Sequence, residues 1–182
     1  MTGAVLDKAA RVDISFTDNK NRGGARYRAA LGLLMGVERT RQMMKIGFIG
    51  TGNMGGALAS AAARSGEVEV LLANRTKAKA EALAERIGAV VSSNEFIARE
   101  ADHIFLGVKP QMLPEVLDPI KDAIHPDKLV VTIAAGKGFS FYASYFGENV
   151  PLVRVMPNIC AQVLCSASAV CPNAACRPEQ VE

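Results

Sequence analysis

Residues 50–55 (GTGNMG) have the glycine spacing of a turn that binds the phosphates of a dinucleotide. An apolar run precedes this segment and an Ala-rich stretch follows it, which is the strand–turn–helix context that the interpretation requires. Gly50 permits a tight turn, Gly52 leaves space beside the backbone for a pyrophosphate, and Gly55 lets the helix pack closely on the strand. The N-terminus of that helix then offers N–H groups and a partial positive charge. The alternative is a glycine-rich turn without a ligand.

The residues after the second apolar run distinguish between the two nicotinamide dinucleotides. An NAD-preferring site usually has Asp or Glu there, which accepts hydrogen bonds from the adenosine ribose. This chain has Asn74, Arg75 and Thr76 and no acid. A carboxylate would repel a 2′-phosphate, whereas the Arg75 guanidinium can bind one through paired N–H donors. We therefore expect NADP(H) as the cofactor, with NAD(H) less favoured; the alternative is a solvated basic turn.

The order of apolar and amphipathic stretches indicates which elements carry these residues. After residue 44, short Val/Ile/Leu runs alternate with Ala-rich amphipathic stretches, the pattern of a βαβ protein with a parallel sheet. The runs are nearly continuous, as in strands covered on both faces. We predict an α/β fold with a Rossmann-type, doubly wound, mainly parallel sheet and helices on both faces. The expected strands are 45–50, 68–73, 89–91, 103–108, 129–134 and 151–156, with 167–171 as a candidate seventh, and the expected helices are 54–65, 77–87, 94–100 and 112–123.

Residues 1–43 differ from the rest of the chain in charge and pattern. They have a net charge of +4, whereas residues 44–182 have −1, so the basic excess belongs to this leader. Its polar part shows neither helical nor strand periodicity, and its short apolar stretch begins too far along for a signal peptide. We predict a non-native or flexible leader (1–43), a dinucleotide-binding domain (44–175) and a tail (176–182).

Composition and cysteine spacing argue against several other classes of protein. No apolar run approaches the ~20 residues that a membrane helix needs, so no membrane association is expected. The body has no basic stripe and aromatic residues make up only 5% of the chain, which argues against a nucleic-acid partner. The spacing of Cys160, Cys165, Cys171 and Cys176 matches neither a zinc site nor a redox motif, so no metal is expected. These features predict a cytoplasmic protein.

Several segments in a fixed order resemble the N-terminal domain of pyrroline-5-carboxylate reductase. The glycine turn recurs in many dehydrogenases, but GVKPQ, IAAG and RVMPN together are much more specific. The family reduces the cyclic imine of 1-pyrroline-5-carboxylate to L-proline with hydride from NAD(P)H, so the resemblance implies an oxidoreductase of proline biosynthesis that acts on a C=N bond of a small imine. The matching segments, within residues 44–175, are MKIGFIGTGNMGGAL (44–58), ANRT (73–76), Asn94 in SSNE, LGVKPQ (106–111), VVTIAAG (130–136), VRVMPN (153–158) and CPNA (171–174).

The resemblance also implies roles for the matching residues. Lys109 would lie at the cofactor, or alternatively is a surface lysine before a proline turn. Asn158 would lie near the substrate, or alternatively forms an Asx turn after Pro157. The residues implied to bind the cofactor are Gly50, Thr51, Gly52, Asn53, Met54, Gly55, Asn74, Arg75, Thr76, Asn94, Val108, Lys109, Pro110, Ala134, Ala135 and Gly136.

Two departures from the family pattern limit what the resemblance implies. The family usually has Thr-Pro after MPN, whereas this chain has Ile159 and Cys160. Family members are homo-oligomers that continue into an all-helical domain, which supplies most of the imine pocket, and we expect that domain to be absent here. No catalytic residue is therefore nominated. The alternatives are a truncated, inactive NADP-binding or regulatory module, and an oxidoreductase acting on another substrate.

Overall fold

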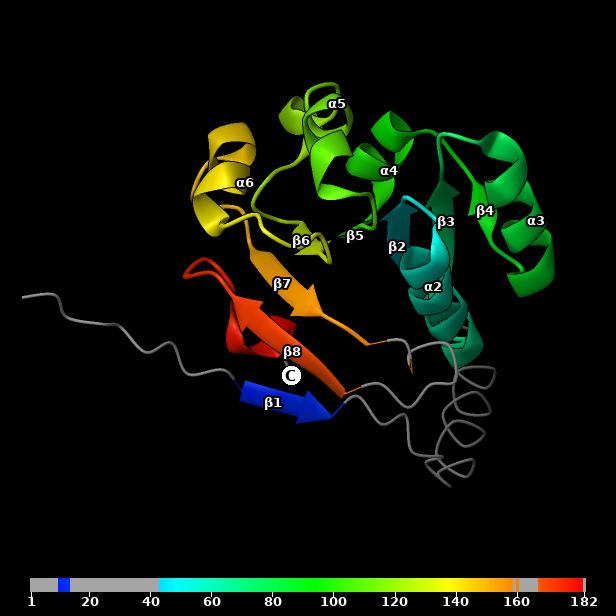
Figure 1. Cartoon of the computed structure of the whole chain (residues 1–182), viewed down its shortest axis with the longest axis horizontal. Helices are drawn as coiled ribbons and strands as arrows, with labels where there is room; N and C mark the ends of the chain where they lie inside the picture. The colour runs from blue at the N-terminus through cyan, green and yellow to red at the C-terminus, as the bar shows by residue number, and fades with distance from the viewer. Residues whose placement is uncertain (1–9, 14–42, 159, 161–166, 182) are drawn as a thin grey trace, which may run out of the picture.

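A computed structural model of the chain describes residues 10–13, 43–158, 160 and 167–181. Eight strands form one sheet in the order β1-β8-β7-β6-β5-β2-β3-β4 (Figure 1). The strands are β1 (Ala10–Asp13), β2 (Met44–Ile49), β3 (Val68–Ala73), β4 (Val90–Val91), β5 (His103–Leu106), β6 (Leu129–Thr132), β7 (Leu152–Met156) and β8 (Ala167–Pro172).

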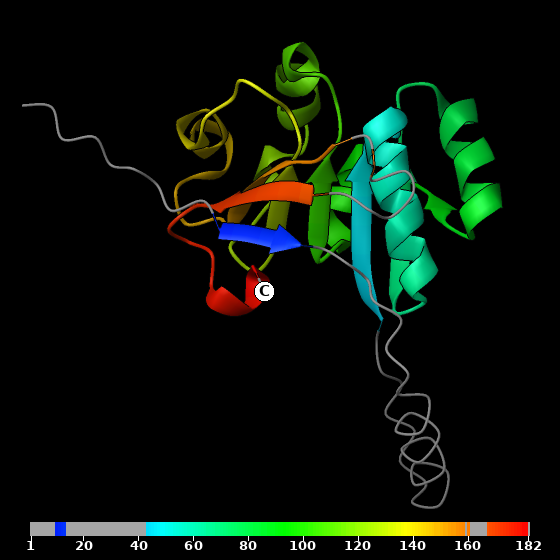
Figure 2. The ribbon, with the colours of Figure 1, turned by 60° about the horizontal axis from the view of Figure 1, so that its bottom comes forward.

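The sheet has the strand order of a Rossmann domain. Strands β4, β3, β2, β5, β6 and β7 are parallel, and the direction of winding reverses at β2. The prediction of a doubly wound, mainly parallel sheet is therefore confirmed. The other two strands are antiparallel additions: β8 pairs with β7, and β1, which lies within the leader, pairs with β8 at the edge (Figure 2).

The parallel strands end in register, and this determines where the loops emerge. Ile49 of β2 lies opposite Ala73 of β3 on one side and Leu106 of β5 on the other. The same row continues through Thr132 of β6 to Arg154 of β7. Because these five strands run in the same direction, the segments that follow them leave the sheet side by side at one edge.

Helices cover both faces of the sheet, as expected. Helices α2 and α3 pack with Phe48, Val70 and Leu72 on one face. Helices α4, α5 and α6 pack with Ile49, Leu71 and other buried strand residues on the opposite face. The helices are α2 (Asn53–Ser65), α3 (Lys77–Ile87), α4 (Asn94–Glu100), α5 (Leu113–Leu117) and α6 (Phe139–Phe146), with 3-10 turns η1 (Pro110–Met112), η2 (Lys121–Ala123) and η4 (Pro178–Gln180).

The C-terminal segment covers the part of the sheet that α2 and α3 leave open. Cys176 and Val181 pack against the buried valines of β6, β7 and β8. The Cys176 Sγ also lies 3.5 Å from the carbonyl oxygen of Leu152. The described residues beyond 175 therefore contact the same sheet as the residues before them. No helix in the described ranges combines the length and the apolar character that a bilayer crossing needs.

Two helices differ from the sequence expectation. The predicted helix 112–123 is too long, because only residues 113–117 form an α-helix, α5, which lies between two 3-10 turns. Pro119 has no N–H to donate and its ring clashes with the carbonyl four residues earlier, which favours a break in the helix there. Helix α6 was not predicted; it lies between Gly138 and Gly147 and consists mostly of aromatic residues. Strands β5 and β6 also end two residues earlier than expected.

Candidate cofactor site

Gly50 makes the turn at the end of β2. Its φ of +96° lies in the left-handed region that favours glycine, and its N–H donates to the carbonyl of Ala73 at 2.8 Å. A Cβ atom at this position would lie 2.7 Å from Cγ1 of Val108 and 2.8 Å from the carbonyl carbon of Gly107. Both the conformation and the space at residue 50 therefore require glycine.

Gly55 and Gly107 allow helix α2 to approach the ends of β2 and β5. A Cβ on Gly55 would overlap the carbonyl oxygen of Gly50, and a Cβ on Gly107 would lie 2.5 Å from the same oxygen. The role expected for Gly55 in helix–strand packing matches this contact. Gly107 was not among the nominated residues, although its position directly after the apolar run 103–106 was a signal for it.

The space beside Gly52 is open. No heavy atom outside Gly52 and its two neighbours in the chain lies within 4 Å of a Cβ built on Gly52, which is the N-cap of the 13-residue helix α2. The helix has no side-chain cap and no acid in its first turn, so its N-terminal N–H groups remain available to an anion. The Oγ1 of Thr51 is the one buried side-chain oxygen or nitrogen in the described part of the chain that lacks a hydrogen-bond partner. An open glycine, an uncapped helix and an unpaired hydroxyl together fit a phosphate-bearing ligand.

The side chain of Asn74 joins the glycine turn to the turn after β3. Its Oδ1 accepts a hydrogen bond from the N–H of Thr51 at 3.2 Å, and its Nδ2 donates to the carbonyl of Thr76 at 3.0 Å. The Asn74 amide therefore forms two hydrogen bonds within the protein. One lone pair on its oxygen and one N–H remain to bind a ribose. Arg75 and Thr76 are exposed beside it, and Thr76 is the N-cap of α3.

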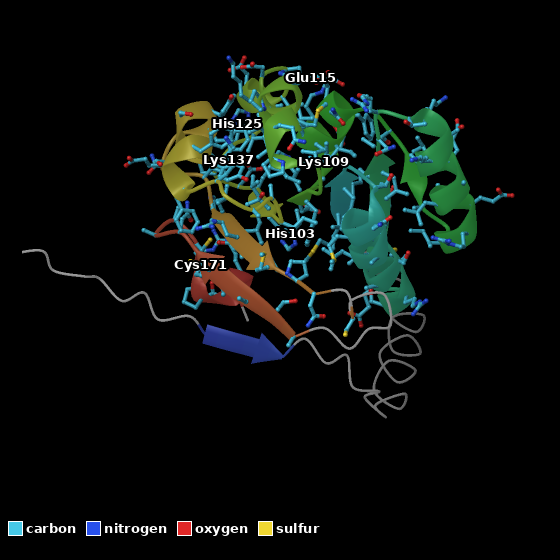
Figure 3. All side chains as sticks on the ribbon, viewed as in Figure 1. His103, Lys109, Glu115, His125, Lys137 and Cys171 are labelled. Atoms are coloured by element: carbon cyan, nitrogen blue, oxygen red, sulfur yellow. The ribbon has the colours of Figure 1, made fainter. Side chains whose placement is uncertain are left out.

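The other nominated residues follow the neighbouring strands at the same edge. Asn94 begins helix α4, just after β4, and Val108 to Pro110 follow β5. Of these, Val108 is next to the glycine turn. In the described residues, no hydrogen bond joins Asn94 or Lys109 to residues 50–55. Lys109 is exposed, whereas Lys137, in the loop after β6, is half-buried with its ammonium 4.4 Å from the centroid of the Phe141 ring (Figure 3).

Helix α6 holds the turn after β6 through a buried pair of hydroxyls. The Tyr142 hydroxyl lies 2.7 Å from Thr132 Oγ1, which also accepts a hydrogen bond from the N–H of Ala134 at 3.3 Å. Tyr142 is 1% exposed, and this burial raises the pKa of its phenol. Ala134 is buried, whereas Ala135 and Gly136 face solvent. The sequence did not reveal Tyr142, since α6 itself was not predicted.

The side chain of Asn158 is engaged within its own loop. Its Oδ1 accepts from the N–H of Cys160 at 3.0 Å, and its Nδ2 donates to the carbonyl of Ala167 at 3.3 Å. The first of these bonds is that of an Asx turn, one of the two expected roles. Cys160 and Cys176 are free thiols, and Cys165 lies outside the described residues.

Neither histidine of the chain lies among the cofactor-site loops. His103 begins β5, so it sits at the opposite edge of the sheet from the glycine turn (Figure 3). Burial lowers the pKa of His103, and the neighbouring carboxylate of Asp102 opposes that effect. His125 lies in the connection between η2 and β6.

The sheet order and glycine turn define the class of fold, a Rossmann domain. Residues 45–136, half of the chain, match the family model described as NADP oxidoreductase, coenzyme F420-dependent, and the chain belongs to that family. Within it, the chain is homologous to pyrroline-5-carboxylate reductases over their NADP-binding region, as its motifs indicated. It is 39% identical to the pyrroline-5-carboxylate reductase of Methanosarcina acetivorans over 142 residues. This aligned region covers 76% of this chain and 53% of that protein.

Solved structures agree with this relationship. The pyrroline-5-carboxylate reductase of Coxiella burnetii superposes with a TM-score of 0.71 at 26% identity, over 76% of this chain and 53% of that one. The Plasmodium falciparum pyrroline carboxylate reductase, solved with NADP bound, gives a TM-score of 0.65 at 28% identity, over 75% and 50%. The chain therefore spans about half the length of the relatives it matches.

Proposed function

We propose that this chain binds NADP(H) and serves as the cofactor-binding part of a pyrroline-5-carboxylate reductase. The observation that carries the proposal is the glycine turn, where the space beside Gly52 is open and the N-terminus of α2 has no side-chain cap. The turn after β3 has Arg75 where an NAD-preferring domain has Asp or Glu. The whole reaction is the reduction of 1-pyrroline-5-carboxylate to L-proline, in a cytoplasmic homo-oligomer of proline biosynthesis.

Each turn at the carboxyl ends of the parallel strands has a proposed role in binding the cofactor. Gly52 and the first N–H groups of α2 bind the pyrophosphate, and Arg75 with Thr76 binds the phosphate of the adenosine ribose. The turns after β5 and β6 flank the nicotinamide, where the small residues Ala135 and Gly136 leave room for the ring. When bound, the nicotinamide supplies the hydride, so these residues need only hold and orient it.

Imine reduction also needs a proton on the substrate nitrogen, and we assign no residue of this chain to that step. Asn158 is the proposed substrate contact, since it follows β7 at the same edge. Its Nδ2 donates to the carbonyl of Ala167, so the loop itself holds the amide in place at that edge.

A binding titration and a turnover assay test the two parts of this proposal separately. The purified chain is titrated with NADPH, following nicotinamide fluorescence, and NADPH oxidation is then measured with and without 1-pyrroline-5-carboxylate. Saturable binding with little or no imine-dependent oxidation is the expected result, because no residue of this chain is assigned to the proton step. Imine-dependent oxidation would show that the chain also turns over the substrate. Absence of binding would reject the cofactor site.

A further inference from the structure

A groove between α2 and α3 leads away from the glycine turn. Its volume is about 880 Å³, and at one end its wall consists of Thr51, Gly52 and Asn53. On the α3 side, the wall at that end includes Lys79, in the first turn of the helix. Arg75, the cation expected to bind the ribose phosphate, is not part of this wall. Lys79 therefore shares the groove with the residues proposed to meet the cofactor phosphates.

The two lysines in the first turn of α3 lie in different surroundings. Lys77 forms an ion pair with Glu81 at 3.3 Å, and both side chains are mostly exposed. Lys79 is two residues further on, about 200° around the helix axis, and so faces a different side. In the described part of the chain no carboxylate lies within ion-pair distance of Lys79, and no acidic residue lines the groove.

The charge pattern of α3 is unfavourable in the absence of an anion. The first turn contains two lysines and no acid, so like charges meet the positive end of the helix dipole. Helix starts ordinarily favour Asp or Glu, and local rules of this kind are most often broken at functional sites. A phosphate beside Lys79 would offset this repulsion and pair with a cation that otherwise has no partner.

We infer that Lys79 is a second cationic contact for the ribose phosphate of NADP(H), facing it from the groove side while Arg75 faces it from the turn. This inference rests on the proposed function, because it places the cofactor at the glycine turn. Lys79 is then a specificity-determining residue: its ammonium distinguishes NADPH from NADH, which differ only in that phosphate. Arg64 and Arg86 line the other end of the groove. Arg86 is seven residues beyond Lys79, about 10 Å along the helix axis, and is too remote to take part.

The test compares Lys79→Met with Lys77→Met by titrating each full chain with NADPH and with NADH at about 0.1 M ionic strength. Both substitutions remove one positive charge from the same turn of α3, but only one removes it from the groove. We expect Lys79→Met to weaken NADPH binding about five- to tenfold and to leave NADH within about twofold, as for a lost charge-assisted hydrogen bond. Lys77→Met should leave both affinities within about twofold, and Lys79→Arg should retain the preference for NADPH.

Each other outcome has a distinct meaning. If the wild-type chain prefers NADPH and Lys79→Met keeps the same NADPH:NADH ratio, the inference is wrong while the proposed function stands. Equal losses for both cofactors in Lys79→Met would also overturn it, because they would indicate a structural effect. A wild-type chain that binds neither cofactor would overturn both the inference and the proposed function.

Discussion

The backbone N–H of Thr51 and the side-chain oxygen of Asn74 form a hydrogen bond of 3.2 Å that ties the glycine turn to the turn after β3. The two residues are 23 positions apart, and the bond connects the proposed pyrophosphate site to the proposed ribose-phosphate site. The amide of Asn74 continues the connection to the carbonyl of Thr76. A change in the conformation of one turn is therefore expected to change the conformation of the other.

Replacement of Asn74 by Ala should weaken the binding of both cofactors. It removes the acceptor for Thr51 and the donor to Thr76, at a cost of about 1–3 kcal/mol shared between stability and binding. We expect roughly a tenfold loss of affinity for NADPH and for NADH alike, measured by fluorescence titration. A selective loss of NADPH binding would contradict this, since it would make Asn74 a direct contact of the 2′-phosphate.

Two glycines of α2, adjacent in sequence, should respond oppositely to the same substitution. A Cβ on Gly55 would overlap the carbonyl oxygen of Gly50, whereas on Gly56 its nearest neighbour is Cδ2 of Leu83 at an ordinary 3.5 Å. Gly55→Ala should destabilise the fold by about 1–3 kcal/mol through overpacking. Gly56→Ala should be neutral or stabilising by up to about 1 kcal/mol, because alanine favours the helix interior. Urea unfolding of both variants measures the difference, and equal stabilities would refute the close approach of α2 to β2.

Loss of the Tyr142 hydroxyl should loosen the turn after β6. Tyr142→Phe leaves the buried Thr132 hydroxyl without its partner at 2.7 Å, which costs about 1–2 kcal/mol of unfolding free energy. Tyr145→Phe is the matched control, because Tyr145 is in the same helix but has no hydrogen bond from its hydroxyl within the described residues. Urea unfolding should separate the two variants. A Tyr142→Phe protein as stable as Tyr145→Phe would show that the hydroxyl pair does not hold the turn.

Stability should fall in mild acid because of His103. Burial lowers the pKa of His103 below its ordinary 6.5 in the folded chain, so the unfolded chain takes up the proton first as the pH falls. The stabilisation by neutral His103 is present above about pH 6.5 and is lost as the pH falls toward the folded-state pKa. We expect His103→Gln to flatten the pH dependence of the unfolding free energy over this range. An unchanged slope in that variant would assign the acid sensitivity to other groups.

The general fold could be predicted because it depends on local patterns. The apolar runs ending at Ile49, Ala73 and Thr132 are buried parallel strands, and their order along the chain implies the helices between them. Helix 112–123 failed because Pro119 outweighs the apolar spacing around it. Helix α6 was not predicted because its aromatic residues also favour strands.

The details of the site were less accessible, because they depend on contacts between distant parts of the chain. The glycine spacing at 50–55 is local and could be interpreted directly. The approach of Gly107 to Gly50, the bond from Thr51 to Asn74 and the position of Lys79 across the groove all arise from packing between separate elements. The sequence alone therefore identified residues that lie at the carboxyl ends of the strands, but not the contacts between them.

The most direct test of the central claim is the ratio of NADPH to NADH affinity in the wild-type chain and in Arg75→Asp, measured by fluorescence titration. Arg75 is exposed beside Asn74, so the substitution places a carboxylate where an NAD-preferring domain has one. We predict a clear preference for NADPH in the wild-type chain and an inverted preference in Arg75→Asp, because the carboxylate repels the 2′-phosphate and accepts bonds from the ribose hydroxyls. A ratio that is the same in both proteins would contradict the assignment of this edge as an NADP site.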